Sequence, residues 1–101
     1  MSKSKLRESY SNLCATIATF EENDIDSLIR QLDIFCSDVW ISHRMQGGVK
    51  SAFILNAFNH FLEHELFPMI EDRAEQIPGI ITDKLMDSVK DTIKDNVQQL
   101  E

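Results

Sequence analysis

Three residues near the middle of the chain have the types and spacing of a zinc site. His60, Glu63 and His64 match the pattern H-x-x-E-H, in which two histidines on one helix face bind zinc and a glutamate acts as a base. A catalytic zinc also needs a third protein ligand, an open coordination position and a sheltered cleft. The alternative is that both histidines line the less apolar side of a hydrophobic helix. We favour it because short patterns often arise by chance, and we predict no metal site.

The other residue types that perform catalysis lack their usual partners. A di-iron site in a helical bundle needs a Glu three residues before a His on two helices, and none of His43, His60 and His64 has one. The serines form no G-x-S-x-G turn, and neither cysteine sits in a Cys–His signature. The three glycines form no phosphate-binding loop. We predict that the chain is not an enzyme and binds no cofactor.

The charge of the chain is concentrated in its second half. The formal net charge is −7, and residues 1–50 carry six basic and seven acidic residues, whereas residues 51–101 carry four and ten. A negative protein is disfavoured at a phosphate backbone, so no nucleic-acid partner is predicted. An acidic half can instead attract a basic partner, and simple solubility is the alternative.

The most regular polar feature is a row of aspartates. Asp83, Asp87, Asp91 and Asp95 recur every four residues, so a helix places them on one face, opposite Leu85. A solvated outer face accounts most simply for such a row. The functional alternative is a docking strip for a basic surface.

Bulky apolar residues in the middle of the chain exceed what one thin bundle readily covers. Aromatic residues and Met are enriched at protein interfaces, while Lys and Glu are depleted. The alternative is that these residues form the centre of a well-covered monomeric core. We predict a partner-binding surface made of the acidic row and of Trp40, Ile41, Met45, Phe53, Phe61 and Phe67.

The elements that would carry these residues are almost all helices, because apolar residues recur every three or four positions. Gly47-Gly48 and Pro78-Gly79 are helix breaks. Pro68 lacks a backbone N–H and clashes with the carbonyl of His64, so the third helix kinks or restarts there. The expected helices cover about residues 4–22, 24–46, 49–67 and 82–100.

These helices predict an all-α fold, an antiparallel four-helix bundle with a kink or a short fifth helix after Pro68. Residues 1–101 would form a single helical domain with a flexible N-terminus at residues 1–4. The polar start does not resemble a signal peptide, and no apolar run approaches the length of a membrane span. We expect a soluble, cytoplasmic protein with no membrane partner.

The two cysteines, Cys14 and Cys36, do not form a disulfide framework. In a hairpin of the first two helices that turns near Asn23, Cys36 lies about 4.5 Å beyond the level of Cys14. A bridge between them would be poorly aligned. We therefore predict two reduced, half-buried thiols.

Together these features predict a small acidic module that masks or bridges a partner protein, as inhibitors, immunity proteins and adaptors do. The aromatic surface would supply affinity, and the acidic helix faces would steer a basic partner. A homodimer is also expected. The main alternative is a structural homo-oligomer whose apolar surface serves only self-assembly, and a histidine-based metal-binding bundle is a less favoured one.

Overall fold

The computed structural model describes the backbone of residues 2–46 and 51–98 and the side chains of residues 5–41 and 56–96. Every regular element in these ranges is helical, so the predicted all-α class is confirmed there. None of the described helices is both long and apolar enough to cross a membrane. The elements are α1 (Ser2–Thr19), the 3-10 turn η1 (Glu22–Asp24), α2 (Ile25–Gln46), α3 (Ser51–Phe61), the π-turn η2 (Leu62–Leu66), α4 (Phe67–Glu75) and α5 (Thr82–Gln98).

The first helix ends earlier than the sequence predicts. Phe20 N–H still donates to Thr16 O at 2.8 Å, but Glu21 and Glu22 follow immediately. Negative side chains are unfavourable at the negative end of a helix dipole. The chain turns through η1 instead and enters α2. The predicted stop at Gly47-Gly48 lies outside the described residues.

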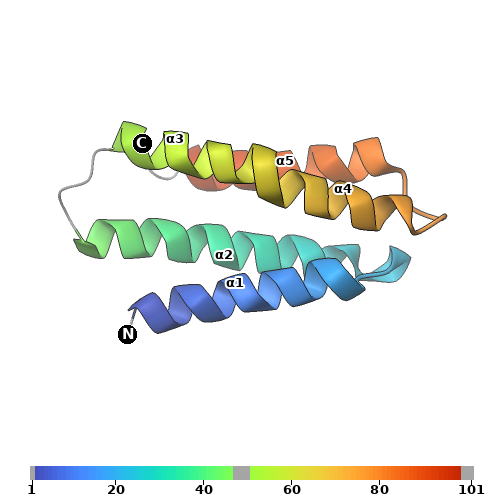
Figure 1. Cartoon of the computed structure of the whole chain (residues 1–101), viewed down its shortest axis with the longest axis horizontal. Helices are drawn as coiled ribbons and strands as arrows, with labels where there is room; N and C mark the ends of the chain where they lie inside the picture. Colours follow the sequence, from blue (N-terminus) through green and yellow to red (C-terminus); the bar gives the residue numbers. More distant parts are fainter. Residues whose placement is uncertain (1, 47–50, 99–101) are drawn as a thin grey trace.

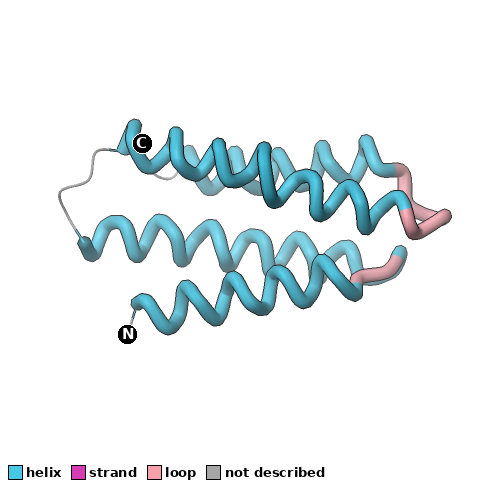
Figure 2. Tube along the Cα trace, viewed as in Figure 1, coloured by secondary structure: helices cyan, strands magenta, loops and turns pink. Residues whose placement is uncertain are grey.

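The helices lie in two layers. α1 and α2 run in opposite directions along one layer, and α3, α4 and α5 cover it (Figure 1). α2 contacts α5, α5 contacts α4, and α4 returns to contact α1. The turn between α1 and α2 and the loop between α4 and α5 lie at the same end of the molecule (Figure 2).

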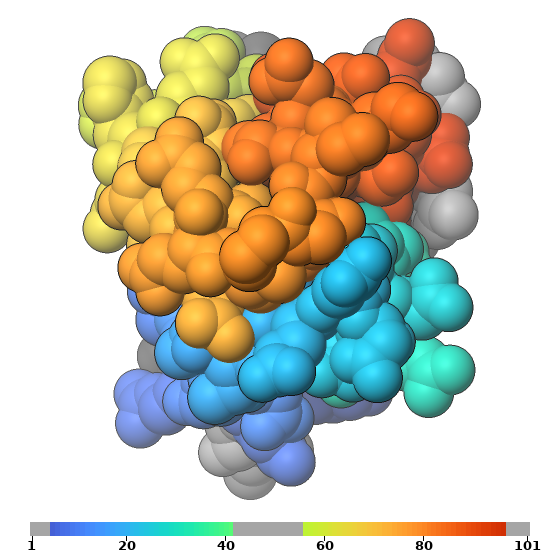
Figure 3. Space-filling view, turned by 90° about the vertical axis from the view of Figure 1, so that its right-hand side faces the viewer, coloured from blue at the N-terminus to red at the C-terminus, as the bar shows by residue number. Residues whose placement is uncertain are grey.

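This end is closed by contacts between segments that are distant in sequence. The residues around the α4–α5 loop pack beside the end of α1 and the start of α2 (Figure 3). Arg73 of α4 donates from Nε and Nη2 to Phe20 O, at 3.1 and 2.8 Å, and its guanidinium lies 5.9 Å from the Phe20 ring centroid. A Cβ on Gly79 would overlap the Glu22 carboxylate, so a larger residue there would require this exposed side chain to move.

The core follows the apolar stripes of the helices. Residues three or four apart face the same side of a helix, so each helix contributes one buried row. The fully buried side chains come from α1, the residue that follows it, α2, η2, α4 and α5, and the largest are Phe20, Leu13, Leu28, Leu32, Leu66, Ile70, Val89 and Cys36.

Two polar contacts, one buried and one partly buried, link neighbouring helices. Ser9 of α1 donates to the Asp38 carboxylate of α2, and both residues are buried. The side-chain amide of Asn96 in α5 donates to Asp33 Oδ1 of α2 at 2.7 Å. Such contacts hold the helices in one register, because a shift would leave a buried polar group without its partner.

The expected break at Pro68 takes the form of a π-turn. In η2, Phe67 N–H donates to Leu62 O, five residues earlier, and α4 begins at Phe67. Pro68 cannot donate to a carbonyl, and its ring crowds the one four residues earlier. The wider turn lies immediately before the proline, and the chain continues from α3 into α4 without a loop.

Both cysteines are free thiols, as the sequence predicts, but only Cys14 is half-buried, and Cys36 is completely buried. Burial raises the pKa of the Cys36 thiol from 9.0 to about 12, and the negative charge of Asp33 contributes a smaller part. The unfolded chain loses this proton near pH 9 while the folded chain keeps it until about pH 12. The free energy of unfolding therefore falls as the pH rises through this window.

We expect this fall to be about 1.4 kcal/mol per pH unit steeper in the wild type than in a Cys36→Ala variant. Urea unfolding at several alkaline pH values measures both slopes. The comparison removes the contribution of the other titrating groups, which both proteins share. Equal slopes would mean that Cys36 ionises as easily in the folded protein as in the unfolded chain.

Candidate functional site

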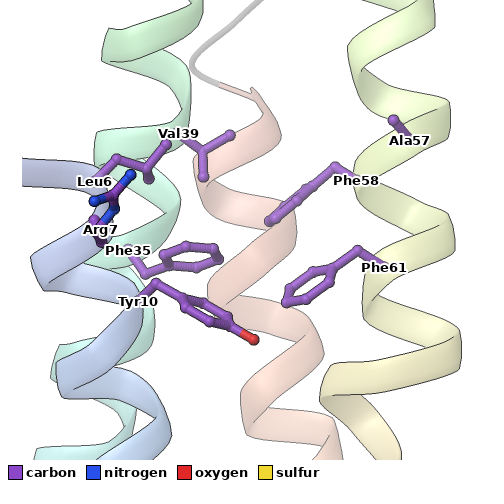
Figure 4. Close-up of a pocket in the computed structure, with 8 residues that line it drawn as sticks. All are labelled: Leu6, Arg7, Tyr10, Phe35, Val39, Ala57, Phe58 and Phe61. Carbon is purple, nitrogen blue, oxygen red and sulfur yellow. The ribbon is translucent and has the colours of Figure 1, made fainter. Parts of the chain in front are cut away.

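An apolar groove lies between α1, α2 and α3. Its volume is about 580 Å³. Side chains from all three helices point into it, and most are aromatic or aliphatic (Figure 4). We call it the aromatic groove, and its lining residues are Leu6, Arg7, Tyr10, Phe35, Val39, Ala57, Phe58 and Phe61.

The groove exists because α3 stands away from the other helices. In the described part of the chain, no Cα atom of α3 lies within 8 Å of α1, α2 or α5, whereas α4 does approach α1 this closely. The seam is thus closed at the α4 end and open beside α3. Only large side chains can span such a gap, which is why phenylalanines link α3 to the rest of the protein.

The aromatic rings form one connected cluster. Ring centroids are 5.8 Å apart for Tyr10 and Phe35, 6.1 Å for Tyr10 and Phe61, and 6.3 Å for Phe35 and Phe58. These separations are within the range of favourable aromatic pairs. Phe35 and Phe58 are buried and form the floor, while Tyr10 is 39% exposed and Phe61 is half-buried. Tyr10 and Phe61 are therefore the aromatic residues of the groove that a ligand can partly reach.

A few polar groups lie at the groove. Arg7 is exposed and contributes a cation. A hydrogen bond and an electrostatic interaction with Cys14 raise the pKa of Tyr10, and partial burial and the negative charge of Glu65 raise it further. Tyr10 therefore presents a neutral hydroxyl at physiological pH. This combination can hold an apolar partner and orient it.

The predicted aromatic and apolar contact residues do not share one surface in the structure. Phe61 lines the aromatic groove. Ile41 is 45% exposed, outside the groove. Phe67 is half-buried, and Lys90 Nζ lies 5.6 Å from its ring centroid. The side chains of Met45 and Phe53 lie outside the described residues.

The prediction that Trp40 contacts a partner needs correction, because this residue is buried. Only 5% of it is exposed, and its ring packs edge-on against Phe58 with the centroids 5.2 Å apart. Its Nε1–H is buried with no acceptor among the residues whose side chains are described. A partner would have to displace Phe58 to reach it. The chain itself covers Trp40, so this tryptophan supports the floor of the groove and does not offer a surface.

The acidic row is separate from the aromatic groove. Asp83, Asp87, Asp91 and Asp95 are all exposed on α5, and none of them lines the groove. The opposite face of α5 is buried, as the spacing of its apolar residues predicts. The row can act on a partner only through its long-range field or at a second contact.

Sequence reasoning missed the contribution of α1. Leu6, Arg7 and Tyr10 form one wall of the groove, and none of them was among the contact residues predicted from the sequence. One available signal was Tyr10 itself, because the hydroxyl of a tyrosine among apolar residues needs a hydrogen-bond partner or contact with water.

His60 and His64 are exposed on the segment that carries Phe61. Within residues 5–41 and 56–96, no group of three or more His, Cys, Asp or Glu side chains converges as a metal site would require. The third ligand of a catalytic zinc is therefore not found there.

Comparison with models of protein families, with curated proteins and with solved structures finds no match. What the groove can bind is therefore inferred from its own residues.

Proposed function

We propose that this chain is a non-enzymatic protein-binding module, an antiparallel four-helix bundle whose aromatic groove receives an amphipathic helix of a partner protein. The observation that supports this most is the groove itself, where Tyr10, which is exposed, and Phe61, which is half-buried, lie over a floor of buried rings. Tyr and other aromatic residues are the usual anchors of protein interfaces.

A helix suits the groove because other helices form its walls. Packed helices lie about 8–10 Å apart, and a partner helix could settle along the seam that α3 leaves open beside α1. It would present apolar residues at positions i, i+4 and i+7 to the aromatic cluster. A volume of about 580 Å³ holds only the apolar face of such a helix, so its polar face would stay in water.

The charges favour a basic helix. The net charge of −7 and the exposed aspartates of α5 create a field that accelerates the approach of a positive partner. At the groove, Glu65 acts electrostatically on Tyr10, and Arg7 offers one site for an acidic residue. The partner would therefore be mainly basic with an acidic residue near Arg7, and the module would mask or bridge it, as an inhibitor, immunity protein or adaptor does.

A photo-crosslinking amino acid in place of Tyr10 tests the proposal directly. We expect it to capture a partner whose crosslinked peptide is amphipathic and basic, while the same group in place of Met69 captures none. Met69 is 38% exposed, almost the same as Tyr10, and lies outside the groove. A crosslink to a second copy of this chain would contradict the proposal and favour the homo-oligomer.

The captured segment, made as a peptide, then gives a quantitative prediction. Tyr10→Ala and Phe61→Ala should each weaken binding about 10-fold to 100-fold, because truncation of a central aromatic anchor costs roughly 2 kcal/mol or more. Met69→Ala and Ile81→Ala remove exposed apolar side chains elsewhere and should change the Kd less than about 2-fold. Similar losses in all four variants would show that the groove is not the binding site.

A further inference from the structure

Two exposed imidazoles face each other on the outer side of the third helix. The ring centroids of His60 and His64 are 4.3 Å apart, and the ring planes are tilted by 39°. His60 lies in the last turn of α3, and His64 lies in η2. Neither residue lines the aromatic groove, so the pair is independent of the proposed helix-binding site.

The sequence alone predicts no metal site, but because the structure brings the two rings together we propose that His60 and His64 chelate one divalent transition-metal ion of the class Zn²⁺, Ni²⁺ and Cu²⁺. Neutral imidazole nitrogen is the commonest protein ligand for these ions and binds at about 2.0–2.1 Å. Residues four apart on a helix are close neighbours, and here the rings already lie together. Small rotations about the side-chain bonds can bring one nitrogen of each ring to the same ion, with little loss of conformational freedom.

The surroundings define which ions the pair accepts. Glu63 and Glu65, adjacent to His64 in sequence, are exposed and favour a cation. Two nitrogen ligands do not suit Ca²⁺ or Mg²⁺, which prefer oxygen. Since no third His, Cys, Asp or Glu converges within the side chains that the structure describes, solvent fills the other positions. Affinity should therefore be moderate and should be greatest for Cu²⁺.

A bound ion would also stiffen the chain locally. It would join the end of α3 to the π-turn, and η2 is the one element that approaches α3 closely in the described structure. We expect amide hydrogen exchange in α3 and η2 to slow when Ni²⁺ or Zn²⁺ is added, with no comparable change in α1. This effect needs no partner protein.

Calorimetric titration of the chain with Ni²⁺ and with Zn²⁺ tests the site. We expect one ion per chain, and at least about 10-fold weaker binding in His60→Ala and in His64→Ala. His43→Ala removes the third histidine and should bind as the wild type does. Unchanged affinity in both single variants, or equal losses in all three, would overturn the proposal.

Pulsed electron paramagnetic resonance with Cu²⁺ gives a second measurement, made in a Cys14→Ser background because an accessible thiol can reduce Cu²⁺. We expect the signature of two imidazole nitrogens on one ion, reduced to one imidazole in each single variant. A single imidazole in the parent protein would show that the two rings do not share an ion.

Discussion

Replacing Arg73 with methionine should lower the free energy of unfolding by about 2 kcal/mol. Arg73 donates two hydrogen bonds to Phe20 O at the C-terminal end of α1, where carbonyl groups lack partners within the helix. Hydrogen bonds to charged groups contribute about 1.5–3 kcal/mol. Methionine keeps much of the apolar stem that packs near Phe20 but leaves the carbonyl without this donor.

Urea unfolding followed by circular dichroism measures the change. Arg73→Lys should lose about half as much as Arg73→Met, because one ammonium group keeps the charge at the helix end but not the planar pair of donors. Arg30→Met is the matched control, since Arg30 is an exposed residue of α2 and should cost less than about 0.5 kcal/mol. A loss in Arg73→Met as small as in the control would show that the Arg73–Phe20 contact does not stabilise the fold.

The fold class could be predicted because helical spacing is a local property. The rows in α1 and α5 are regular enough to fix which face is buried, and the structure buries Leu13, Ile17, Leu85 and Val89 accordingly. The contact from Arg73 to Phe20 could not be predicted in this way. It joins residues 53 positions apart, and only the packed helices bring them together.

The spacing of the buried residues around the π-turn is a sequence signal that can be interpreted once the structure is known. Phe58, Leu62, Leu66, Ile70 and Ala74 are all buried and are spaced by four residues throughout. In a regular α-helix each such step advances the face by about 40°, so five positions would wind away from one side. A π-turn contains more residues per turn than an α-helix, so it returns the buried row to the side of the helix that faces the core. Pro68 marks where the turn occurs, and the unbroken spacing of four gives a reason for it.

The candidate site was only partly predictable, because a groove depends on where helices diverge. The excess of aromatic residues in α2 and α3 directed attention to these helices, and Phe35, Phe58 and Phe61 do line the groove. The composition of these helices does not indicate which rings cover one another, and from composition alone Trp40 was predicted to be a surface residue. The structure shows that Phe58 covers Trp40, while Tyr10, from a helix with a modest apolar stripe, is exposed at the groove.

Phe58 is the residue on which this arrangement depends most, and its truncation gives the largest expected effect. Its ring contacts Trp40 and Phe35 and stacks with Phe61 at a centroid distance of 6.4 Å. In the described structure no Cα atom of α3 lies within 8 Å of α1, α2 or α5, so α3 packs on α2 there through large side chains such as this ring.

Phe58→Ala should therefore lower the free energy of unfolding by about 3 kcal/mol, at the lower end for a buried Phe because the adjacent groove lets the site relax. It should also shift the emission of Trp40, the single tryptophan of the chain, to longer wavelength in the folded state. Asn59→Ala changes the exposed neighbouring residue and should alter neither quantity appreciably. If Phe58→Ala costs less than about 1 kcal/mol and leaves the emission unchanged, α3 does not pack through this ring. The groove would then lack the wall on which helix binding depends.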